Sequence, residues 1–175
     1  PKYTNVSRFS KRKDHYTTLK AFKIVLRRIK NVKLILIGYG PELKNIIGFA
    51  KNLKINKNII VINKTYNPYS YMKKSKLLIL TSVYEGFPNV LVESLTIGTP
   101  VISTNANAGA SEILLNGKGG DLIRIGDYES LAKKIIRHFS YPKILIKKAK
   151  IAKKNLYRFE TKRHSKIYTN LFQRI

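Results

Sequence analysis

Short aliphatic runs alternate with amphipathic stretches along most of this chain, and no other feature restricts its fold as much. The runs at residues 33–37 and 77–81 are apolar at nearly every position, which is typical of parallel strands covered on both faces. Residues 16–29 instead repeat apolar side chains at helical spacing. The alternation predicts an α/β fold, with a Rossmann-like parallel sheet and helices on both of its faces.

The same patterns give an expected order of elements. Strands are expected at residues 3–7, 33–37, 58–62, 77–81, 101–104 and 120–123. Helices are expected at residues 16–29, 42–53, 68–74, 88–97, 110–115 and 128–139, with residues 143–175 as terminal helices. A length of 175 residues fits one domain of about 100–200 residues, so we treat residues 1–175 as one unit. Because the chain opens at Pro1 and enters a strand at once, we expect it to be excised from a longer protein.

The chain is strongly basic, with 35 Lys plus Arg against nine Asp plus Glu and a formal charge of +26. Solvated helix faces are the ordinary explanation, and attraction to an anionic membrane surface or a polyphosphate is the alternative. No dedicated nucleic-acid motif is present, so no nucleic-acid partner is expected. The absence of cysteine excludes disulfides and thiolate metal sites. No apolar run approaches the ~20 residues of a membrane span.

Parallel sheets of this kind bind ligands at the carboxyl ends of their strands, where the strand order switches. The loops expected at this edge span residues 8–15, 38–41, 63–67, 82–87 and 105–109. Glu85 lies in one of them, and Glu93 follows in the next helix. Acids are scarce in this chain, and neither residue stands at a helix start, where a carboxylate would offset the helix dipole. The two glutamates are therefore candidate ligand contacts.

Between these glutamates lies a turn suited to phosphate. Gly86 lets a ligand approach the backbone closely, and Pro88 suits a first helical position. The amides of Phe87, Asn89 and Val90 would then point into the crevice and bind phosphate. An ordinary strand-to-helix turn would have the same residues, so this segment alone does not distinguish a phosphate-binding turn from a structural one.

Two cations are expected at the same edge. Arg8 and Lys13 flank four residues just beyond the first strand. Fixed cations stabilise the charge that develops on a diphosphate leaving group, whereas carboxylates accept hydrogen bonds from vicinal hydroxyls. Paired acids around a phosphate-binding turn suit a ligand with sugar at both ends and phosphate between, as in a nucleotide-sugar.

The motifs occur in a characteristic order: Val6-Ser7-Arg8 with Lys13, then Ile37-Gly38-Tyr39-Gly40-Pro41-Glu42, then Glu85-Gly86-Phe87-Pro88-Asn89-Val90-Leu91-Val92-Glu93, then Gly98-Thr99-Pro100. Over roughly residues 4–140 the chain resembles the C-terminal half of group 1 glycosyltransferases (glycosyltransferase family 4), which have the GT-B fold. The two glutamates with Gly-Phe-Pro between them are the specific signal. The resemblance is strongest to enzymes of bacterial capsule, exopolysaccharide or lipopolysaccharide assembly.

The resemblance implies a role for each matching residue. Arg8 and Lys13 would grip the donor diphosphate, and Glu85 would contact the transferred sugar. The backbone from Gly86 to Val90, including Phe87, Pro88 and Asn89, would hold sugar and phosphate. Glu93 would bond the ribose hydroxyls, and the segment Ile62, Asn63 and Lys64 would line the base.

The resemblance also implies a retaining glycosyltransferase that takes its sugar from a UDP- or GDP-sugar and requires no metal or other cofactor. The acceptor would be a glycan or a lipid-linked sugar. The N-terminal acceptor domain would lie outside this chain, so the isolated domain is expected to be inactive. We expect a cytoplasmic enzyme, with peripheral contact at the anionic inner face of the membrane.

Three substitutions depart from the usual family pattern. Ser7 replaces a common glycine, Asp14 follows Lys13 and could pair with it, and Ala108-Gly109-Ala110 replaces a loop richer in glycine or proline. Two other functions remain open. One is a nucleotide-sugar 2-epimerase on the same scaffold, for which we identify no additional acid or base. The other is a non-enzymatic polyanion-binding module.

Overall fold

The computed structural model describes residues 1–160 together with residues 163, 165, 169 and 172. It contains one six-stranded parallel sheet in the order β3-β2-β1-β4-β5-β6. The strands are β1 (Lys2–Val6), β2 (Lys33–Ile37), β3 (Ile59–Ile62), β4 (Leu77–Leu80), β5 (Val101–Thr104) and β6 (Asp121–Ile123). This is the predicted Rossmann-like α/β fold.

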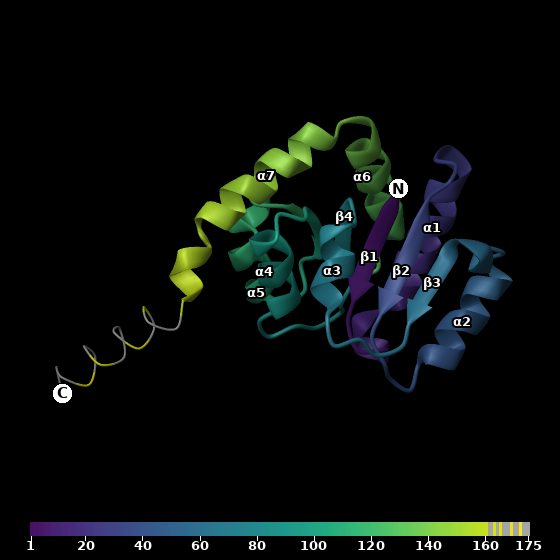
Figure 1. Ribbon diagram of the computed structural model, residues 1–175, viewed down its shortest axis with the longest axis horizontal. Coiled ribbons are helices and arrows are strands. Elements are labelled where there is room, and N and C mark those ends of the chain that lie inside the picture. Colours follow the sequence, from purple (N-terminus) through teal and green to yellow (C-terminus); the bar gives the residue numbers. More distant parts are fainter. Residues whose placement is uncertain (161–162, 164, 166–168, 170–171, 173–175) are drawn as a thin grey trace.

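Seven α-helices are described, and the sheet lies between them (Figure 1). They are α1 (His15–Arg28), α2 (Leu43–Asn52), α3 (Pro68–Lys73), α4 (Asn89–Thr96), α5 (Ala108–Ile113), α6 (Tyr128–Ser140) and α7 (Pro142–Lys154). Short 3-10 turns occur at Lys11–Lys13, Asn56–Asn58, Leu115–Gly117 and Leu156–Phe159; the last of these lies within the expected terminal helices. Most of the expected terminal helix beyond residue 160 lies outside the described residues.

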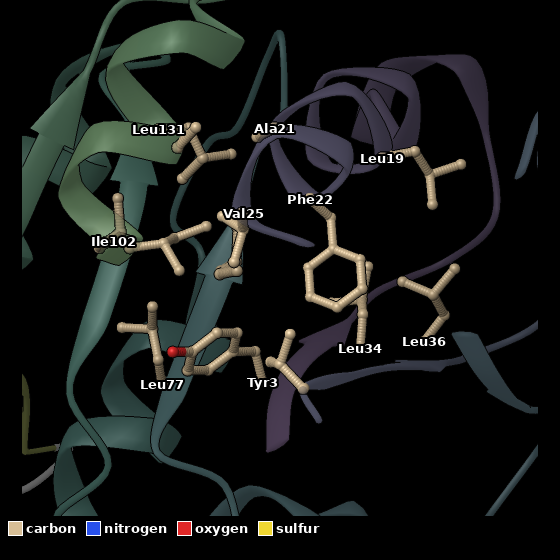
Figure 2. Packing of buried hydrophobic residues seen from close by; sticks show 14 of the residues in the cluster. Tyr3, Leu19, Ala21, Phe22, Val25, Leu34, Leu36, Leu77, Ile102 and Leu131 are labelled. Carbon is tan, nitrogen blue, oxygen red and sulfur yellow. The ribbon is translucent and has the colours of Figure 1, made fainter. Parts of the chain in front are cut away.

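The central strands β1, β2, β4 and β5 are buried on both faces, and they divide the core in two. In β4, Leu77 and Ile79 join one cluster, which α1, α2 and α6 cover, whereas Leu78 and Leu80 join the other, under α3, α4, α5 and α7. The division follows the two-residue repeat of a strand. Figure 2 shows the first cluster, where Phe22 and Val25 of α1 meet strand side chains.

The helix starts combine local caps with this packing. Asp127 Oδ1 accepts a hydrogen bond from Ser130 N over 3.0 Å and caps the start of α6. In the described part of the chain, no helix is both long and apolar enough to cross a bilayer.

The loops after β1 and β2 pack backbone against backbone. Phe9 N donates to Tyr39 O over 2.8 Å, and Glu42 N donates to Phe9 O over 3.1 Å. Gly38 and Gly40 have φ angles of 149° and 152°, and an added Cβ would lie 1.9 Å from Ser7 O and 2.2 Å from Phe9 O, respectively. Gly38-Tyr39-Gly40 therefore allows the two loops to approach.

We predict that Gly40→Ala lowers the free energy of unfolding by about 2–4 kcal/mol, because both the φ angle and the Phe9 carbonyl oppose a side chain. Gly48→Ala is the matched control, since its Cβ would meet nothing within 4 Å in helix α2. The control should gain about 0.5–1 kcal/mol. Urea unfolding measures both, and an unchanged midpoint for Gly40→Ala would contradict the packing argument.

Candidate functional site

The strand order reverses between β1 and β4: β2 and β3 lie on one side of β1, and β4 to β6 lie on the other. The loop after β1 and the loop after β4 meet at this switch point, where such folds bind their ligands. Val83 N donates to Arg12 O over 2.8 Å. Thr81 Oγ1 donates to Asp14 O, also over 2.8 Å. The loops that hold Arg8, Lys13 and Glu85 therefore form one connected edge.

Glu85 is held in place by two partners. Its side chain forms an ion pair with Lys13, and Ser82 Oγ donates to it over 2.6 Å. Both partners bind Oε1, and among the described residues nothing binds Oε2. Glu85 is only 8% exposed, and a buried carboxylate requires such pairing. One oxygen thus anchors the side chain, and the other remains available to a ligand.

Arg8 lies at a hollow of about 210 Å³ above the carboxyl ends of β1, β2 and β3. Lys64 and Tyr39 also line this hollow. Ile62, at the end of β3, accepts a hydrogen bond from Gly38 N through its carbonyl over 3.1 Å, and Asn63 is exposed beside it. Of the three residues expected to line a base, Lys64 contributes to the hollow, and the other two precede it in the chain.

The turn after Glu85 leaves room above its backbone. A Cβ on Gly86 would meet nothing within 4 Å, whereas one on Gly109 would lie 2.2 Å from Gly86 O. Gly86 is therefore not required by the packing of the protein, but Gly109 is. One expectation needs correction, because Asn89 N already donates to Phe87 O over 3.0 Å and is not a free donor. The tight turn around Pro88 at the start of α4 brings these two groups together.

Glu93 lies on α4, eight residues after Glu85, and is half-buried. Partial burial raises the pKa of its carboxyl group. Among the described residues no group forms a hydrogen bond or an ion pair with this carboxylate. Glu93 is therefore outside the bonded network of Lys13, Ser82 and Glu85, and it has its full capacity to accept hydrogen bonds.

A polar row that the sequence patterns miss supports the loop after β1. Ser7 Oγ donates to Asn5 Oδ1 over 2.8 Å and lies 3.1 Å from His15 Nε2. Because the single hydroxyl proton of Ser7 goes to Asn5, His15 Nε2 must donate to Ser7 Oγ. His15 is 1% exposed, and burial together with the nearby Lys13 charge lowers its pKa to about 4. His15 is thus a neutral buried group.

The sequence allowed Asp14 to pair with Lys13, but in the structure it does not. It adopts a left-handed conformation with φ 41° and caps α1, accepting from Thr17 N over 3.2 Å and from Thr17 Oγ1 over 2.6 Å. Capping takes up the Asp14 carboxylate and leaves Lys13 to Glu85. Ser82 was also missed as a partner of Glu85, although it lies two residues beyond β4, next to the buried Thr81.

Larger hollows occur away from this edge. One of about 640 Å³ lies near Pro1, His138 and Pro142, and one of about 550 Å³ lies near Glu112 and Arg158. Neither contains a predicted site residue. The ion pair of Lys13 with the Glu85 carboxylate and the open backbone at Gly86 distinguish the switch point, where volume alone would not.

Comparison with known proteins gives consistent matches. The model of the family Glycosyl transferases group 1 matches residues 1–158. The capsular polysaccharide biosynthesis glycosyltransferase CapM of Staphylococcus aureus is 33% identical over 132 residues, which cover 74% of this chain and 34% of CapM. A Campylobacter jejuni N-acetylgalactosaminyltransferase that acts on a diphospho-undecaprenol-linked sugar is 30% identical over 128 residues, covering 73% of this chain and 34% of that protein.

Solved structures match over nearly the whole chain. S. aureus TarM, solved with Fondaparinux, alpha-GlcNAc-glycerol and UDP, superposes with a TM-score of 0.90 at 22% identity over 98% of this chain and 35% of TarM. At this identity the match establishes the fold. The chain spans about a third of the length of the curated relatives it matches.

The buried His15 makes stability depend on pH. Its folded pKa, about 4, lies below its ordinary value of 6.5, so between these values the unfolded state binds more protons. We predict that the free energy of unfolding falls by up to about 3 kcal/mol as the pH drops through this window. Urea unfolding of His15→Gln, which keeps a donor but does not titrate, should show a flatter pH profile. Parallel profiles for the two proteins would contradict this assignment.

Proposed function

Since the chain belongs to the group 1 glycosyltransferases, we propose that it is the donor-binding half of a retaining enzyme that uses a nucleotide-sugar. The acceptor is a glycan or a lipid-linked sugar in the synthesis of a cell-surface polysaccharide. The observation that carries this proposal is the junction of Lys13, Ser82 and Glu85 at the switch point of the sheet.

The junction supports separate tasks for its charged groups. Lys13 keeps further N–H donors for a diphosphate while one contacts Glu85. Glu85 Oε2 has no partner among the described residues, so it can accept a hydrogen bond from the transferred sugar. Ser82 fixes the rotamer of Glu85, so the carboxylate loses little freedom when the sugar binds.

The rest of the donor would extend along the same edge. Arg8 and Lys13 would neutralise the diphosphate as its bond to the sugar breaks. The open backbone at Gly86, with the amides of Phe87 and Val90, would approach the phosphate and the sugar. Glu93 would accept hydrogen bonds from the ribose hydroxyls, and the hollow beside Lys64 would take the base of a UDP- or GDP-sugar.

The chemistry would be a same-face displacement, in which the leaving phosphate helps to deprotonate the acceptor hydroxyl. The C1–O bond to the diphosphate breaks, the C1–O bond to the acceptor forms, and the acceptor proton passes to the departing phosphate. Side-chain cations balance the charge of the leaving group, so we propose no metal requirement and no separate base in this half.

The N-terminal half of the enzyme would bind the acceptor, and the isolated chain would transfer little sugar. The named relatives act in capsule synthesis and on a sugar carried by diphospho-undecaprenol. By analogy, we place the reaction in the cytoplasm, at the inner face of the membrane.

Gly86→Ala should bind donor at least tenfold more weakly and unfold at an unchanged urea concentration. A methyl group there meets no protein atom but occupies the space that we assign to the donor. Titration calorimetry with a panel of UDP-, GDP- and ADP-sugars measures the affinity, and Gly48→Ala serves as the control. A Gly86→Ala protein with unaltered affinity for the preferred donor would refute the assigned position.

Replacement of each glutamate should change different kinetic constants in the enzyme that contains both halves. Glu93→Ala should mainly weaken nucleotide binding and raise KM, because it removes a ribose contact. Glu85→Gln should lower kcat more than it raises KM, because it removes charge next to the reacting sugar. Steady-state kinetics with the preferred donor separates these effects. Small and equal effects of the two changes would count against both roles.

A further inference from the structure

The most basic segment of the chain has no acidic residue. Between Glu129 and Glu160 the sequence contains ten Lys or Arg and neither Asp nor Glu. Helix α7 lies in this segment and contains six of the lysines. It lies along the border of the molecule, where Figure 1 shows it at the upper left.

Helix α7 buries only one narrow side. Leu145 packs into the first core cluster, and Ala149 and Ala152 pack into the second. The opposite side is exposed and consists of lysines and isoleucines; we call it the α7 surface: Lys143, Ile144, Lys147, Lys150, Ile151 and Lys154. Ile144 and Ile151 are seven residues apart and therefore lie in line along the helix.

Apolar exposure is concentrated around this helix. Ile144 is 43% exposed and Ile151 is 39% exposed. Of the sixteen large apolar side chains that are exposed among the described residues, six lie between positions 139 and 157, and two of these six, Ile144 and Ile151, belong to the α7 surface. A solvated lysine face would not require them. Exposed aliphatic side chains in such a group instead mark a contact surface.

The charge on this surface is not neutralised by the protein itself. Lys148, at the edge of the buried side, forms an ion pair with Asp121 over 2.5 Å. Among the described residues, none of the four lysines of the α7 surface has an acidic partner. Their charges are therefore available to an external anion.

We propose that the α7 surface binds the anionic headgroups of a lipid bilayer. The ammonium groups contact lipid phosphates, and Ile144 and Ile151 enter the boundary between headgroups and acyl chains. This inference rests on the proposed function for its setting at the inner membrane face, but it assigns the contact to one helix.

The isoleucines favour a bilayer over a dissolved polyanion. Lysines bind either partner by charge, whereas burial of exposed aliphatic side chains needs an apolar phase. The position of α7 is also compatible with donor entry. The arrowheads of β1 to β3 point away from the start of α7 in Figure 1, so contact through the first turns of this helix leaves the carboxyl edge open to a dissolved donor.

The test is co-sedimentation of the 175-residue chain with vesicles of phosphatidylcholine alone or mixed equally with phosphatidylglycerol. We expect binding to the anionic vesicles only. Lys147→Gln with Lys154→Gln should lower the partition coefficient about 25-fold, at about fivefold for each lysine. Lys44→Gln with Lys51→Gln removes the same charge from exposed positions on α2 and should change binding little.

The apolar part of the contact has its own variants. Ile144→Ser with Ile151→Ser should lose vesicle binding but keep its binding to soluble heparin. Because the chain has no cysteine, Ile151→Cys and Ile47→Cys can each carry one environment-sensitive dye. Only the dye at position 151 should shift to the blue on anionic vesicles.

Two results would overturn the proposal. Equal losses for the α2 and α7 lysine pairs would mean that binding is spread over the whole charged surface. Unchanged vesicle binding by the isoleucine pair would mean a polyanion contact without insertion. Calorimetric donor titration of the same variants should stay unchanged, so a failed donor site would be recognised separately.

Discussion

The site depends on the parallel pairing of β1 with β4, which joins segments more than seventy residues apart. This pairing places the loop with Lys13 beside the loop with Glu85, and their ion pair closes the edge. Hydrogen bonds from Val83 to Arg12 and from Thr81 to Asp14 fix the same junction through backbone carbonyls. The ion pair thus has a rigid frame, because strands, turns and a helix cap all constrain the two side chains.

Acidic residues are few in this protein, and the structure gives most of those it describes a definite partner. Asp14 and Asp127 cap helices, Asp121 contacts Lys148, and Glu85 contacts Lys13. Glu42, which we expected merely to start a helix, accepts a hydrogen bond from Tyr16 over 3.1 Å. Glu93 differs because it is half-buried without a partner among the described residues. Most basic side chains among the described residues form no ion pair, and many are exposed on helices such as α7.

Much of the fold follows from local patterns. The strands β2 and β5 have the predicted bounds, and the others differ by a residue or two, because an aliphatic run covered on both faces leaves little choice of conformation. The site was predicted less completely. The burial of His15 depends on packing against distant segments, whereas the Ser82 contact and the loss of the free Asn89 amide arise in short turns whose geometry the sequence patterns do not specify. The sequence left open whether Asp14 pairs with Lys13, because adjacency in sequence does not decide which of two acids a lysine reaches.

The sequence by itself determined the order of strands and helices, the edge at which the polar loops gather, and the motif of two glutamates around a Gly-Phe-Pro turn. Periodicity and glycine positions are local properties, so they specify helices, strands and turns without reference to distant segments. Only the tertiary structure decided that Lys13 pairs with Glu85, that Gly38 and Gly40 serve backbone packing, and that the lysines of α7 face outward together with isoleucines. These outcomes arise from contacts between distant segments, whose geometry is set by the packing of the whole sheet.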